Sequence, residues 1–150
     1  MFNPFRKKPD LVPPPEDSWS IGKSERNGAP MLLRLNTALK SCVGSPTFSH
    51  RVGVAVPLHA PEPNGLPGTD ESIALGEIED NLLSALCASR QTVFALVITT
   101  GGFREFVFYS SVPHEAAKVL EHLRETTSSH KLQFYVESDP KWQVYRDFQF

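Results

Sequence analysis

The sequence predicts an α+β domain of the ferredoxin-like class, preceded by a β-hairpin and followed by a short aromatic helical tail. From residue 50 onward, apolar periodicity gives the order strand, helix, strand, strand, helix, strand, which is the ferredoxin-like order. With 150 residues, 40% of them hydrophobic, the chain can bury one core but is short for two. We therefore expect a single domain over residues 18–150, after a tail over residues 1–17.

The elements of the first half are expected to be extended. Residues 1–17 mix prolines with charges and lack a repeating apolar face, so they are predicted to be flexible or polyproline II-like, with an SH3-type ligand as the alternative. Residues 18–36 place Asn27-Gly28 between two extended runs, and this pair accepts the positive φ angles of a hairpin turn. Residues 50–59 alternate as a half-buried strand does, and a breaker-rich loop over 57–69 follows.

Two helices and three strands are expected in the second half. Apolar residues recur at helical spacing over 70–89. Two β-rich runs, 92–100 and 103–109, meet at a Gly-Gly pair that is typical of a tight hairpin. A second amphipathic helix is predicted over 112–126, with a proline in its first turn, and a last strand over 131–138.

In this order both helices cover one face of the sheet, and the other face needs separate cover. The helix-covered side is predicted to hold Val52, Val54, Val56, Leu132, Phe134 and Val136. Strands 92–100 and 103–109 are apolar on both sides. Cover for the second face is therefore expected from the N-terminal segment, the C-terminal tail, a second subunit or a ligand.

The tail carries Trp142, Tyr145 and Phe148 near one face of a helix that Asp139-Pro140 is expected to start. Burying each ring contributes roughly 1.5 to 3 kcal/mol before entropy is counted. This favours docking of the tail on the domain's own sheet. The alternative is an exposed anchor for a partner, because Trp and Tyr are common in binding hot spots.

Composition indicates a cytoplasmic protein that avoids membranes and has no general affinity for nucleic acid. Cys42 and Cys87 show neither CxxC spacing nor a disulfide framework. The longest apolar run, over 92–100, is too short to span a bilayer, and no secretory apolar region follows Lys7 and Lys8. A net charge of -2 offers no attraction to phosphates or anionic lipids.

Motifs for catalysis, metals and cofactors are not found in the sequence. His114 begins the first half of a zincin helix motif, but Lys118 stands where the second histidine is needed. The five histidines show no pair at i, i+4, so we predict no metal and no cofactor. Glu77 and Asp80 share a helical face that we interpret as solvated. No catalytic residue is assigned, and the absence of these motifs favours a non-enzyme while leaving an enzyme of unfamiliar type open.

Strand 103–109 occupies the place where RNA-recognition domains carry stacking aromatics. Phe106, Val107 and Tyr109 match the end of that octamer, whereas its beginning does not match. Arg104 stands beside the Gly-Gly turn, where it pairs across the hairpin or presents its guanidinium to an anion. The candidate binding residues are Arg104, Tyr109, Trp142 and Tyr145.

The chain resembles a family of bacterial proteins known only as domain of unknown function six-nine-five. The motifs that carry the resemblance are Trp19, "NGAP" at 27–30, "GLP" at 65–67, "IED" at 78–80, "TTGGFREFVFY" at 99–109 and "DPKWQVYRDF" at 139–148. The final "QF" departs from the usual proline-containing finish. The resemblance implies a small cytoplasmic α+β domain without established catalytic residues. Similar domains are joined to one resembling the inhibitor of a bacterial RNA-degrading endonuclease, which implies regulation through protein contacts.

Together these observations favour a non-catalytic interaction or regulatory module that acts through contacts with another protein or with a second copy. Two alternatives stay open. One is an enzyme or small-molecule sensor with a pocket beside the 57–69 loop, using Glu77, Asp80 or Arg104. The other is an RNA-binding ferredoxin-like domain.

Overall fold

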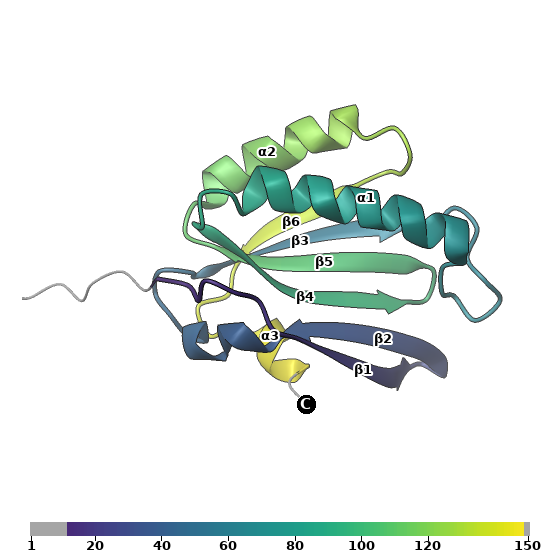
Figure 1. Cartoon of the computed structure of the whole chain (residues 1–150), viewed down its shortest axis with the longest axis horizontal. Coiled ribbons are helices and arrows are strands. Elements are labelled where there is room, and N and C mark those ends of the chain that lie inside the picture. The colour runs from purple at the N-terminus through teal and green to yellow at the C-terminus, as the bar shows by residue number, and fades with distance from the viewer. Residues whose placement is uncertain (1–11, 149–150) are drawn as a thin grey trace, which may run out of the picture.

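The computed structural model describes residues 12–148 and forms a six-stranded antiparallel sheet with the order β1-β2-β4-β5-β3-β6 (Figure 1). Its strands are β1 (Trp19–Arg26), β2 (Ala29–Asn36), β3 (His50–Pro57), β4 (Thr92–Thr100), β5 (Phe103–Ser110) and β6 (Gln133–Ser138). Its helices are the 3₁₀-helix η1 (Thr37–Cys42), α1 (Thr69–Leu86), α2 (Pro113–Thr126) and α3 (Gln143–Asp147). The predicted mixed α+β class is confirmed.

The predicted N-terminal hairpin is confirmed as β1 and β2. Asn27 and Gly28 have φ angles of 53° and 79°, the left-handed values that a two-residue hairpin turn requires. In the register, Arg26 faces Ala29 across the turn. Because β2 also pairs with β4, the hairpin extends the sheet beyond β4 and leaves β1 as an edge strand.

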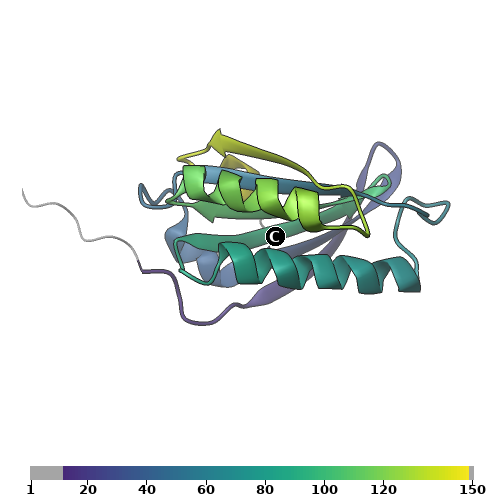
Figure 2. The ribbon, with the colours of Figure 1, turned by 90° about the horizontal axis from the view of Figure 1, so that it is seen from above.

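Helices α1 and α2 lie side by side on one face of the sheet (Figure 2). They cover the valines of β3, as the alternation predicts, because even-numbered residues of that strand point to this face. The buried cluster contains Val52, Val54, Val56, Leu75, Ile78, Leu82, Leu86, Phe94, Phe106, Phe108, Leu120 and Leu132, with Phe134 and Val136 packed at its margin. Helix α1 ends at Leu86 rather than Ser89, because Cys87 caps it and Arg90 turns into a left-handed conformation with φ 62°.

The second sheet face is covered by this chain's own segments, namely η1, Phe48 and α3. The cluster there contains Met31, Leu33, Leu35, Leu39, Cys42, Phe48, Val93, Leu96, Ile98, Val107, Tyr109, Trp142 and Tyr145. The sequence predicts that the tail helix begins at Asp139-Pro140. In the structure, α3 begins at Gln143. Trp142 is left-handed, with φ 57°, so the residues before Gln143 form a turn that lays the indole on the sheet.

Of the predicted tail over 1–17, residues 1–11 lie outside the described residues. Within the described part, Pro13 is buried and Pro14 is half-buried. Pro13 and Pro14 therefore pack on the domain, whereas residues 15–17 are exposed. Within residues 12–148, no helix has the length and apolar character needed to cross a membrane.

Candidate functional site

Tyr109, Trp142 and Tyr145, three of the predicted binding residues, are fully buried. The Trp142 indole stacks on the Tyr109 ring at 3.9 Å between centroids, and its Nε1 donates to the Phe48 carbonyl at 2.8 Å. Tyr145 donates its hydroxyl to the Asn36 carbonyl at 2.8 Å. The aromatic stripe is thus core, as the burial argument favours. A direct role of these rings in partner binding stays a prediction, and it requires the tail to detach.

The Asp139 carboxylate connects the tail, at Gln143, to Tyr109 and Arg51 of the sheet. It accepts hydrogen bonds from the Gln143 backbone N–H at 2.9 Å, from the Tyr109 hydroxyl at 2.8 Å and from Arg51 at 2.8 Å. Burial tends to raise the pKa of Asp139, but these donors outweigh it and hold the pKa below its ordinary value. Burial, followed by the Asp139 carboxylate, raises the pKa of Tyr109, so this phenol stays a neutral donor. Asp139 therefore acts as a structural clamp.

Arg104, the fourth predicted binding residue, lies on the sheet face that carries α1. Its Nε donates to Thr99 Oγ1 at 2.8 Å across the β4–β5 hairpin, in line with the cross-strand pairing that the sequence indicates. Burial, and then the charge of Arg34, lower the pKa of Arg104. Arg34 itself forms a salt bridge with Glu79. Arg34 and Arg104 thus both lie near the Glu79 carboxylate, Arg34 in a salt bridge and Arg104 through its charge.

Glu77 and Asp80, the other polar residues of the predicted sensor pocket, belong to helix α1. Both side chains lie on the exposed face of α1, as the amphipathic pattern predicts. Glu77 lines a depression with Ile78, Asn81, Leu123 and residues 126–129. A sensor pocket that uses Glu77, Asp80 or Arg104 stays a prediction.

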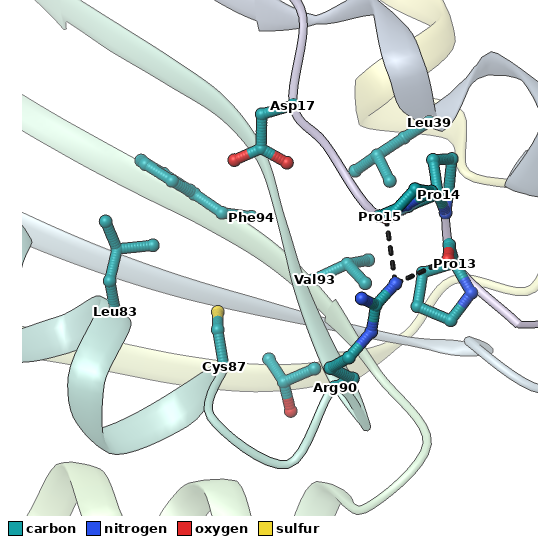
Figure 3. Close-up of a pocket in the computed structure, with 11 residues that line it drawn as sticks. Pro13, Pro14, Pro15, Asp17, Leu39, Leu83, Cys87, Arg90, Val93 and Phe94 are labelled. Atoms are coloured by element: carbon teal, nitrogen blue, oxygen red, sulfur yellow. Dashed lines mark hydrogen bonds between the residues drawn. The ribbon is translucent and has the colours of Figure 1, made fainter.

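A groove at the end of α1 holds the segment Pro13–Pro15 against β4 (Figure 3). The Arg90 guanidinium donates to two successive carbonyls of this segment, that of Pro13 at 2.5 Å and that of Pro14 at 2.9 Å. A cavity of about 190 Å³ remains beside the prolines. Its walls are Asp17, Leu39, Leu83, Cys87, Arg90, Thr92, Val93 and Phe94.

Cys87 is the one cysteine that lines this groove. Burial, and then the neighbouring Asp17 carboxylate, raise the pKa of its thiol to about 12. Reactive cysteines require a lowered pKa, so Cys87 is an inert wall residue and not a nucleophile. Cys42, also a free thiol, is fully buried on the opposite sheet face.

A second cluster, formed by His59, Glu71 and His130, was missed by the sequence analysis. His130 Nε2 lies 2.6 Å from a Glu71 carboxylate oxygen, and the His59 ring stacks on the His130 ring at 4.0 Å. Glu71 also accepts from the backbone N–H groups of His59 and Ala60 at 2.8 and 3.1 Å. Burial tends to raise the pKa of Glu71, but these hydrogen bonds lower it overall. The spacing along the chain carries no local signal, because Glu71 and His130 are 59 residues apart.

The comparison with protein families matches residues 17–150 to a family of unknown function, DUF695. The chain belongs to the DUF695 family. The resemblance seen in the sequence motifs is thus confirmed. Comparison with curated proteins and with solved structures gives no match. The DUF695 match begins after Pro13–Pro15, so the groove walls and Arg90 lie inside the matched region and the prolines lie before it.

Proposed function

We propose that this DUF695 domain is a non-catalytic interaction module that binds an extended, proline-containing segment of another protein in the groove beside Arg90. The observation that carries the proposal is the pair of hydrogen bonds from one guanidinium to the successive carbonyls of Pro13 and Pro14. Under this proposal, Pro13–Pro15 occupy the place in the groove that the partner's proline-containing segment would take.

The chemistry of the groove is that of polyproline recognition. A polyproline II segment has no internal hydrogen bonds, so its carbonyls remain available to donors, and its stiffness lowers the entropy lost on binding. Arg90 supplies a charged donor, whose Nη2 serves both carbonyls. Phe94, Leu39 and Leu83 supply apolar walls, and the remaining 190 Å³ leaves room for a further side chain of the bound segment.

Because Pro13–Pro15 belong to the same chain as the groove, they compete with a partner segment for binding to it. A tethered segment of this length has an effective concentration in the millimolar range, so a free peptide must outcompete it. Release of residues 13–15 would open the groove, and this gives the module a simple means of regulation.

The finer fold and location belong to the same proposal. We infer that β3 to β6 form a ferredoxin-like unit, supported by the spatial order β4-β5-β3-β6 and by α1 and α2 on one face. The two free cysteines support a reducing, cytoplasmic compartment. The RNA-binding alternative is not carried forward, because stacking needs exposed rings and Phe106, Phe108 and Tyr109 are fully buried.

The test uses the full chain with the groove vacated by Pro13→Ser, Pro14→Gly and Pro15→Ser. A fluorescent peptide with the sequence VPPPEDS is titrated and followed by anisotropy. We expect saturable binding to the vacated chain and weaker binding to the wild type, in which the tethered prolines compete. Chemical-shift changes at the methyl groups of Leu39, Leu83 and Val93 on addition of the peptide, followed by NMR, locate the bound peptide in the groove.

Arg90→Asn in the vacated background should weaken peptide binding about tenfold or more, because hydrogen bonds to a charged group contribute about 1.5–3 kcal/mol. Asn accepts the left-handed backbone of position 90, so the substitution removes the donors with little strain. Arg26→Asn, at an exposed position far from the groove, is the matched control. Absence of binding to the vacated chain, or equal binding by the Arg90 and Arg26 variants, would overturn the proposal.

A further inference from the structure

We propose that His59, Glu71 and His130 form a binding site for a divalent transition-metal ion. One ligand atom from each side chain lies within 4.8 Å of the other two. The inference is independent of the peptide groove, which is lined by other residues.

The donor set selects the class of metal. Two imidazoles and one carboxylate suit zinc, iron(II), cobalt, nickel or copper, whereas magnesium and calcium prefer all-oxygen surroundings. Glu71 and His130 are nearly enclosed, with side-chain exposures of 8% and 3%. His59 is exposed. Three protein ligands with one exposed side leave a position for water or for a small ligand.

The surroundings already hold two of the three ligands in place. The backbone N–H groups of His59 and Ala60 donate to the two oxygens of Glu71, which fixes the direction of the carboxylate. On His130, Nδ1 lies 3.3 Å from the Ser129 hydroxyl, and Nε2 points at Glu71. Contacts of this kind orient metal ligands and tune their basicity.

Metal entry requires only a small rearrangement. Neutral His130 takes the tautomer with its proton on Nδ1, beside the Ser129 hydroxyl, which frees the Nε2 lone pair for the ion. The 2.6 Å separation between Nε2 and the Glu71 carboxylate oxygen opens to roughly 3.4 Å, so that the ion bonds to both at about 2.0–2.2 Å with tetrahedral geometry. His59 then rotates out of its stack on His130 to offer a ring nitrogen. Because protons compete with the metal for both imidazoles, affinity falls as the pH falls.

The three ligands come from separate parts of the chain. His59 follows β3, Glu71 lies in the first turn of α1, and His130 precedes β6. A bound ion would therefore join the 57–69 loop to the α2–β6 connection and stabilise the fold against unfolding.

The competing explanation is a hydrogen-bonded clamp without metal, since Glu71 already accepts three donors. A substitution of His59 distinguishes the metal site from the hydrogen-bonded clamp. Within residues 12–148, the His59 imidazole stacks on His130 and makes no hydrogen bond. Truncating His59 thus removes a metal ligand and leaves the clamp between Glu71 and His130 intact.

The experiment titrates Co²⁺ into the full, metal-stripped chain at pH 7.5 and follows the visible ligand-field bands, with Zn²⁺ measured in parallel by calorimetry and thermal melting. We expect one ion per chain and a rise in Tm with Zn²⁺. His59→Ala should weaken binding at least tenfold and remove most of the Tm rise. His122→Ala, an exposed histidine on α2, should match the wild type.

Glu71→Gln and His130→Gln should each reduce the Co²⁺ spectrum as His59→Ala does, with folding checked by circular dichroism. The proposal is overturned if the wild type shows no saturable binding of one ion, or if His59→Ala binds as tightly as His122→Ala. The second outcome would assign the cluster to the hydrogen-bonded clamp alone.

Discussion

Replacing Trp142 by alanine tests whether the tail is part of the core. The indole is fully buried and stacked on Tyr109, and truncation of a buried Trp costs about 3–5 kcal/mol. The substitution also removes the donor to the Phe48 carbonyl, which adds about 1 kcal/mol. The expected loss of roughly 4–6 kcal/mol compares with a typical total stability of about 5–15 kcal/mol, so Trp142→Ala should be close to unfolding.

Urea denaturation followed by far-UV circular dichroism measures this loss. Phe148→Ala is the matched control, because that ring is only half-buried at the end of the same tail, and it should cost about 1–2 kcal/mol. A loss of less than about 1.5 kcal/mol for Trp142→Ala would refute the reasoning. It would mean that the tail detaches at low cost, and a role of Trp142 as an anchor for a partner would become tenable.

Two pH dependences follow from the buried hydrogen bonds. The pKa of Glu71 is lowered in the fold, so its stabilising contribution is present above an unfolded pKa of about 4.3 and is lost as pH falls through the folded pKa. The gap in unfolding free energy between wild type and Glu71→Gln should therefore close in acid, and a constant gap from pH 7 to pH 3 would contradict this. Burial, followed by the neighbouring Cys42, raises the pKa of Tyr145 to about 12, so the contribution of its neutral phenol should be lost as pH rises above an unfolded pKa of about 10. Thermal melting between pH 9 and pH 12 should show a shallower loss for Tyr145→Phe than for wild type, and identical profiles would count against the assignment.

Most secondary structure could be predicted because its signals are local. Alternation identifies β3, and Asn27-Gly28 identifies the first hairpin from turn chemistry alone. The burial of Trp142 and Tyr145 was also favoured, because a bare apolar sheet face and an aromatic stripe occur in one short chain. Neighbouring residues carry the information for the strand and the turn, whereas the burial of the tail follows from matching two apolar surfaces within one chain.

The remaining features depend on tertiary contacts. Left-handed Trp142 delays the start of α3, a conformation that nothing in the "DPKW" stretch demands. Arg90 reaches Pro13 across 77 positions of the chain. His59, Glu71 and His130 meet only after β3, α1 and β6 are placed, so a search for ligands at helical spacing could not find them.

The 57–69 loop carries His59, one of the three proposed metal ligands. A substitution of Gly65 tests whether the conformation of this loop positions that ligand. Gly65 has φ 85°, accepts a hydrogen bond from the Gly102 N–H at 2.9 Å, and would place an added Cβ 3.2 Å from the Gly101 backbone. Gly65→Ala should destabilise the fold by about 1–2 kcal/mol and push the loop away from the β4–β5 turn. His59 begins this loop, so Co²⁺ binding should weaken although all three ligands remain. Unchanged Co²⁺ affinity would show that the Glu71 contacts with His59 and Ala60 alone position the third ligand.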